Sequence, residues 1–183
     1  MVGNPYDRDA QRRRDGGNHR YVFDIPLDRA TSHAIQGFNA YWLRKAEGKA
    51  MPARADIDPA EIKPILPDMV LLNVEWEPFR CSIRLRGTRA EQFRPKHVSK
   101  YLDEATTFEP GRREDYLAEM KFVATQRRPA FSRDYLTTRS GLVRDIWAGV
   151  WPLAPLGERV NMLVVIEDFA GLDASDFDLG RPA

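Results

Sequence analysis

The most regular pattern in the chain is an alternation of apolar and polar residues from Phe79 to Arg86. One set of alternate positions is apolar and the other is polar: Phe79, Cys81, Ile83 and Leu85 against Arg80, Ser82, Arg84 and Arg86. A period of two is typical of an antiparallel strand with one face on the core. The β-rich residues 69–74 precede it, and residues 75–78 have the composition of a turn. The sequence therefore predicts two paired strands that end at Gly87.

Apolar residues at helical spacing predict two long helices. The first can be capped by Thr31 or Ser32 and runs to about Glu47, where Gly48 ends it. Its apolar face carries Ile35, Phe38, Trp42 and Leu43. The second runs from Arg112 to Gln126, with an apolar face of Tyr116, Leu117, Met120, Val123 and Ala124. A short helix follows the Asp58-Pro59 cap and reaches about Leu66.

Three more strands are predicted at residues 130–138, 144–153 and 160–169, separated by turn residues. In the middle strand both alternate sets are apolar, so both faces of this sheet need a cover. We expect the N-terminal helix to cover one face through Ile35, Phe38 and Trp42. The alternative is a homodimer in which these three residues pair with the same helix of a second chain.

Length and charge limit the classes of protein that this chain can represent. Its 183 residues fit one domain, flanked by a predicted disordered tail at 1–24 and an acidic flexible tail at 170–183. A formal net charge of +1 argues against nucleic-acid or membrane binding. No apolar run approaches the ~20 residues of a membrane span. The single cysteine fits a reducing compartment, and the expected location is cytoplasmic.

Several segments, in this order and spacing, resemble a family of small bacterial PAS-like domains. They are MPARADIDP (residues 51–59), ILPDMVLLNV (65–74), RLRGT (84–88) and YLDE (101–104). The resemblance implies an α+β fold for residues 25–169: a five-stranded antiparallel sheet, short helices, one long crossover helix and an N-terminal flanking helix. It also implies a non-catalytic sensory or signalling domain that binds a small molecule or a protein partner. In such folds the connection after Gly87 often borders the ligand cavity; here residues 94–99 lack the usual glycine.

The last strands carry the residues that we predict to bind a ligand. Arg133 and Arg144 could pair with a carboxylate or phosphate, and Tyr135, Trp147 and Trp151 could line the same cavity. The alternative is that the aromatic residues belong to the core and the arginines are charges at the sheet edge.

The residues give little indication of a metal site, a reactive cysteine or a bound cofactor. Three histidines and one cysteine have no metal-ligand spacing, so His33 and His97 are expected to be surface residues and no metal is predicted. Cys81 is expected to pack in the core. No cofactor can be identified. Two alternative functions remain: a protein-interaction module with a filled core, and a small NTF2-like α+β enzyme whose site the sequence does not reveal.

Overall fold

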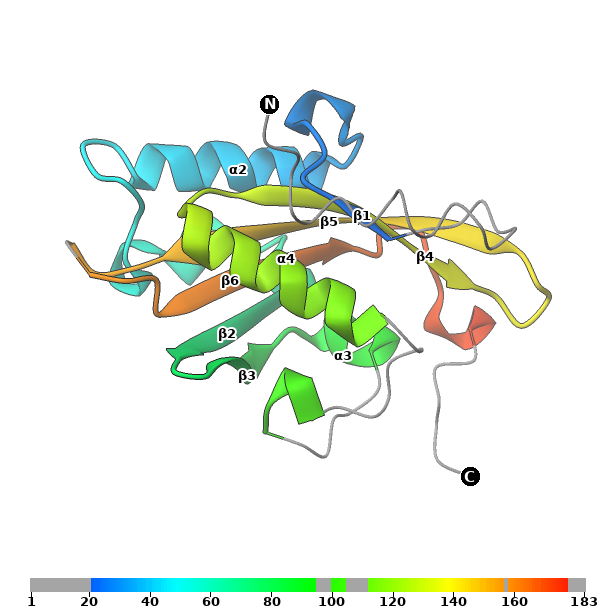
Figure 1. Ribbon diagram of the computed structural model, residues 1–183. Coiled ribbons are helices and arrows are strands. Elements are labelled where there is room, and N and C mark those ends of the chain that lie inside the picture. Colours follow the sequence, from blue (N-terminus) through cyan, green and yellow to red (C-terminus); the bar gives the residue numbers. More distant parts are fainter. Residues whose placement is uncertain (1–20, 95–99, 105–111, 157, 178–183) are drawn as a thin grey trace, which may run out of the picture.

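The computed structural model describes residues 21–94, 100–104, 112–156 and 158–177, and they form a single antiparallel sheet with helices on both faces (Figure 1). The strand order is β1-β4-β5-β6-β2-β3. The strands are β1 (Val22–Phe23), β2 (Met69–Trp76), β3 (Phe79–Arg86), β4 (Ala130–Thr137), β5 (Val143–Leu153) and β6 (Met162–Asp168). The five predicted strands are thus confirmed as one antiparallel sheet, and β1 adds a sixth at the edge of β4.

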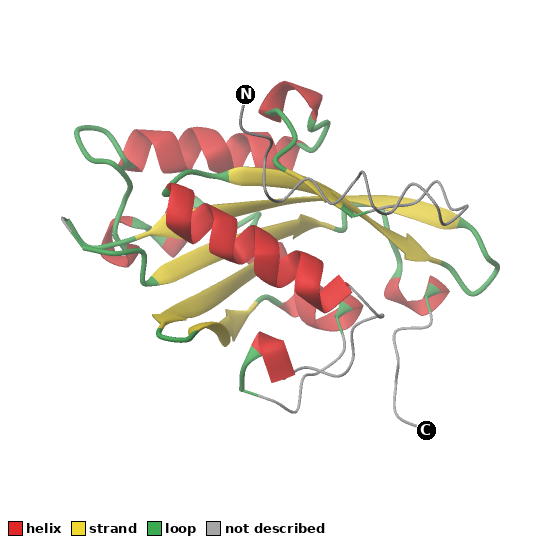
Figure 2. Ribbon diagram, in the orientation of Figure 1, coloured by secondary structure: helices red, strands yellow, loops and turns green. Residues whose placement is uncertain are grey.

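Helices α2 (His33–Lys45) and α4 (Arg112–Gln126) lie on opposite faces of the sheet (Figures 1 and 2). The bounds of α4 are those that the sequence predicted. The short elements are α3 (Thr88–Phe93), η1 (Leu27–Arg29), η2 (Arg54–Asp56), η3 (Pro59–Glu61), η4 (Leu66–Asp68), η5 (Leu102–Glu104) and η6 (Ala174–Asp176). No helix in the described ranges has both the length and the apolar composition that crossing a membrane requires.

The face of α2 predicted to be apolar packs on the sheet of the same chain. Ile35 and Phe38 are fully buried, and the Phe38 ring meets the Trp151 ring edge-on at 4.8 Å. Trp42 donates a hydrogen bond from Nε1 to the Pro152 carbonyl over 3.0 Å. The helix starts after Ser32, whose Oγ accepts from the Ile35 amide and so caps it. A homodimer through these side chains stays a prediction, and α2 would have to leave the sheet to form it.

A β-bulge interrupts the alternation that the sequence predicted for β3. Leu72 pairs with Ile83 but Leu71 pairs with Leu85, so one extra residue of β3 lies between these pairs. The bulge moves Leu85 to the opposite sheet face, where it is 51% exposed. Arg86, predicted on the solvent side, instead shares the α4 face with Ile83. The single-face assignment is therefore wrong beyond Ile83.

The ordered fold extends into both predicted tails. In the N-terminal one, β1 pairs Val22 with Arg133 and Phe23 with Ser132, and directly after this tail the Ile25 amide donates to the Phe131 carbonyl. At the other end Phe177 is 2% exposed, because its ring packs against Phe93 at 5.7 Å. Arg139 also donates from its amide to the Asp176 carbonyl and from Nε to the Phe177 carbonyl, so the segment is held by backbone contacts as well as by the buried ring. Residues 1–20 and 178–183 lie outside the described ranges.

The connector between α2 and the sheet is held by local hydrogen bonds. Asp58 caps the short η3 helix as predicted, accepting from the Ala60 amide at 2.8 Å. Asp56 accepts from the Ala53 amide and pairs with Lys49, while Arg54 donates to the Ile57 carbonyl. Asp56 therefore takes Lys49 as its cation, and Arg54 serves as a donor to the nearby backbone.

Candidate functional site

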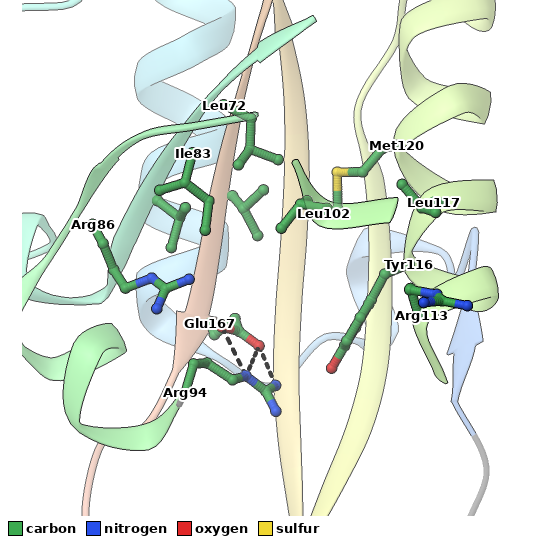
Figure 3. A pocket seen from close by; sticks show the side chains of 12 residues that line it. Leu72, Ile83, Arg86, Arg94, Leu102, Arg113, Tyr116, Leu117, Met120 and Glu167 are labelled. Carbon is green, nitrogen blue, oxygen red and sulfur yellow. Dashed lines mark hydrogen bonds and ion pairs between the residues drawn. The ribbon is translucent and has the colours of Figure 1, made fainter. Parts of the chain in front are cut away.

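A cavity of about 70 Å³ lies between the sheet and α4 (Figure 3). Strands β2, β3 and β6, helix α4 and the η5 turn supply its apolar wall: Val70, Leu72, Ile83, Leu102, Leu117, Met120 and Val165. Its remaining lining residues are polar or charged: Arg86, Arg94, Arg113, Tyr116 and Glu167. This space is several times what one water molecule needs. The cavity is therefore amphipathic and large enough for a small molecule.

Strand register explains why these residues meet. Val70 lies opposite Val165 and Leu72 opposite Leu163, and directly opposed residues share one face of a sheet. Two residues further along β6, Glu167 lies on that same face. The bulge in β3 then brings Arg86 to the α4 side, opposite Val70. Without the bulge the period of two would place Arg86 on the other face.

A buried ion-pair cluster closes the polar end of the cavity. Arg94 Nε donates to both Glu167 carboxylate oxygens at 2.9 and 3.2 Å, and its Nη2 reaches Asp134 Oδ2 at 3.2 Å. Asp134 also accepts from the Tyr116 hydroxyl and pairs with Arg112. Burial lowers the pKa of Arg94, but the facing Glu167 carboxylate, Tyr116 and Tyr21 together raise this pKa by more, so Arg94 stays charged. The cluster ties α3, α4, β4 and β6 together.

Glu119 of α4 is another buried acid; it stands in the chain directly before the lining residue Met120 but does not itself line the cavity. Its side chain accepts from the Tyr21 hydroxyl and from Ser132 Oγ, while Oε1 has no hydrogen-bond partner among the described residues. Burial raises the pKa of Glu119 to about 7, although the Tyr21 and Ser132 hydrogen bonds lower it. The Tyr21 ring packs edge-on against Tyr116 at 4.9 Å. The N-terminal segment thus contacts a residue of the cavity wall.

The five residues predicted to bind a ligand do not line this cavity. Trp151 is fully buried on the α2 face, where its Nε1 donates to Asn39 Oδ1 at 3.0 Å. Trp147 lies opposite Arg133 in the β4–β5 ladder; Trp147 is half-buried and Arg133 is exposed. Arg144 is exposed, and the half-buried Tyr135 ring lies 4.5 Å from the guanidinium carbon of Arg112. A role of these residues in ligand binding stays a prediction.

Sequence reasoning missed the charged lining of the cavity. Arg94 opens the connection after Gly87, which the resemblance placed beside the cavity, so its position was a usable signal. His97 and the other residues of this connection after Arg94 lie outside the described ranges. Glu119 stands three residues after Tyr116 on the predicted apolar face of the helix, and an acid at such a position is an indication of a buried carboxyl. Glu167 and Arg86 had no comparable signal.

Two further residues lie where the sequence predicted them. Cys81 is fully buried and burial raises the pKa of its thiol to about 12, so it is a packing residue. His33 is exposed at the start of α2. Among the described residues, no three side chains of the metal-binding types His, Cys, Asp and Glu are grouped to hold a metal ion.

Comparison with known proteins gives one family match. The model of the family described as "PAS domain" matches residues 30–146, which is more than half of the chain. One solved structure that is similar to this chain is described as the structure of an RNA-binding light-oxygen-voltage receptor. The two have 8% sequence identity and a TM-score of 0.42. The alignment covers 86% of this chain but 39% of the receptor chain. No curated protein matches.

Proposed function

Because this chain belongs to the PAS domain family of sensory and signalling domains, we propose that it is a non-catalytic cytoplasmic sensor of a small molecule. The ligand would occupy the cavity between the sheet and α4. The observation that carries this proposal is the amphipathic lining, in which apolar side chains of β2, β3 and β6 end at half-buried arginines. Ligand sites commonly combine a mainly apolar wall with a few convergent polar groups.

Strand β6 offers a route from the cavity to α2. Val165 and Glu167 line the cavity. The alternate residues Val164 and Ile166 face the other side, where Val164 lies opposite Trp151 and Trp151 contacts Phe38 of α2. Close-packed interiors transmit small displacements. Occupation of the cavity would therefore move β6 and change the packing of α2, which would present the signal to a partner.

The chemistry of the lining supports binding in preference to catalysis. Glu167 is the acid that lines the cavity, and Arg94 holds both of its oxygens. A carboxylate whose two oxygens are both engaged by a guanidinium is poorly placed to take a proton from a bound molecule. Arginine side chains serve mainly as fixed positive donors.

Native mass spectrometry of the purified full chain tests the proposal. We expect a co-purifying small molecule in the wild type and its loss in Val165→Phe, because a larger side chain at the wall fills the cavity. Leu85→Phe is the matched control, since it introduces the same side chain at an exposed position on the other sheet face. Equal retention of the molecule by both variants would exclude this site. So would a wild-type mass that equals the mass of the polypeptide alone, if no added small molecule binds at the cavity.

A further inference from the structure

Resting on the proposed ligand binding at this cavity, we propose that the ligand is a small organic carboxylate with a short apolar body. Its carboxylate would lie beside Arg86 and its apolar body against Leu72, Ile83 and Val165. Figure 3 shows this division: Leu72 and Ile83 lie toward one end of the cavity, while Arg86 and the Arg94–Glu167 pair lie toward the other. Each end of the cavity matches one end of such a ligand.

The charges of the lining favour an anion. Three guanidinium groups and one carboxylate line the cavity. The carboxylate is that of Glu167, and Arg94 donates to both of its oxygens. Arg113 pairs with Glu114 at 3.0 Å, and the acids that act on Arg86 are Glu167 and Glu91. Glu91 and Glu114 are both exposed to water. Water screens exposed charges much more than buried ones. The lining itself therefore carries more guanidinium groups than carboxylates, which favours a carboxylate ligand over a cation.

Arg86 is the residue on which anion binding would depend most. Its half-buried guanidinium loses hydration, and this burial lowers the pKa of Arg86, with Arg94 adding to the effect while Glu167 and Glu91 oppose it. A carboxylate brought beside it would offset the lost hydration. The planar guanidinium can also bind both carboxylate oxygens at once, which fixes the orientation of the bound molecule.

The apolar end restricts the ligand to one charged group. Leu72 and Val165 have no hydrogen-bonding group in their side chains, and the Met120 sulfur is only a weak acceptor, so this end cannot satisfy a second carboxylate or a sugar hydroxyl. A polar group buried there without a hydrogen-bond partner would lose more free energy of hydration than it gains from apolar contacts. The cavity of about 70 Å³ also limits the apolar body to a short chain or small ring.

Methyl NMR titration of the full chain with hexanoate and, separately, hexanamide tests this inference. The two molecules have the same apolar body, and one carries a charge. We expect hexanoate to shift the Leu72, Ile83 and Val165 methyl signals with an affinity at least about tenfold above that of hexanamide, since hydrogen bonds to charged groups contribute about 1.5–3 kcal/mol. Arg86→Gln should remove this preference, and Arg84→Gln, an exposed arginine of the same strand, should keep it.

The possible outcomes separate this inference from the proposed function. Equal binding of both molecules, or a preference for hexanoate that survives in Arg86→Gln, would overturn the carboxylate assignment and leave the cavity as a ligand site. Absence of any methyl shift with either molecule, together with a clean native mass, would overturn both. The comparison of the two probes on the wild type needs no variant to fold, and the methyl spectrum of Arg86→Gln shows whether that variant does.

Discussion

Glu119 predicts a pH dependence of stability whose size follows from its burial. The side chain is inside the fold between Tyr21 and Ser132, and burial raises its pKa from 4.5 to about 7. Nearby Glu167 and Asp24 add to this rise. In the native state the carboxyl therefore keeps its proton over a pH interval in which the unfolded chain has released it.

The sign of the effect follows from this difference in bound protons. The contribution of Glu119 to the free energy of unfolding is fully present below about pH 4.5, falls as pH rises, and is lost once pH has passed about 7. At about 1.4 kcal/mol for each pH unit, the full loss is about 3 kcal/mol. Glu119→Gln keeps the shape of the neutral acid and cannot ionise, so its stability should lack this component.

Urea unfolding followed by circular dichroism, from about pH 5 to about pH 8, measures this difference. We expect Glu119→Gln and the wild type to be similar in stability at the acidic end, and the variant to be about 2–3 kcal/mol more stable at the alkaline end. All other titratable groups are the same in both proteins, so their effects cancel in the comparison. Glu114→Gln, at an exposed position of the same helix, should follow the wild type throughout. Parallel profiles for Glu119→Gln and the wild type would refute the reasoning.

Three further variants test other contacts. Gly87→Ala should destabilise the fold by about 1–3 kcal/mol in urea unfolding, because its Cβ would lie 2.2 Å from the Leu66 carbonyl oxygen, which is backbone and cannot move aside; an unchanged midpoint would contradict this. Arg94→Met should cost about 3–5 kcal/mol because it removes the cation that pairs with buried Glu167, and adding Glu167→Met should recover part of this loss; a double variant less stable than the single variant would show that the two residues are not coupled in this way. Trp151→Phe should lower stability by about 1–3 kcal/mol through its lost hydrogen bond and leave hexanoate binding unchanged; weaker binding in a folded Trp151→Phe would instead return Trp151 to the ligand site.

The local pattern was sufficient where one element buries one face. The apolar residues of Arg112–Gln126 recur at helical spacing, and Pro110, Gly111 and Pro129 flank them, so the helix was predicted with its final bounds. Alternation and turn residues likewise located five strands of the sheet. Such patterns depend on near neighbours in the chain, and the sequence contains those directly.

The tertiary structure decided the composition of the cavity. Arg86 reaches it because a bulge shifts the register of β3 against β2, and a one-residue shift moves a side chain to the other face of a sheet. Arg94 and Glu167 are 73 residues apart, and no periodicity relates residues at such a distance. The aromatic residues of β5 were correctly identified as strand residues, but Trp151 faces α2, on the side opposite the cavity.

What the sequence determined by itself is the order and type of the elements, because propensity, capping and period act over a few residues. What only the folded chain decided is which charges share a buried space, as at Arg86, Arg94, Glu119 and Glu167. Their partners come from distant segments, and burial of a charge is tolerated only when those segments supply a partner or a proton. The chemistry of this site therefore depends on strand register and helix packing, which nearby residues do not specify.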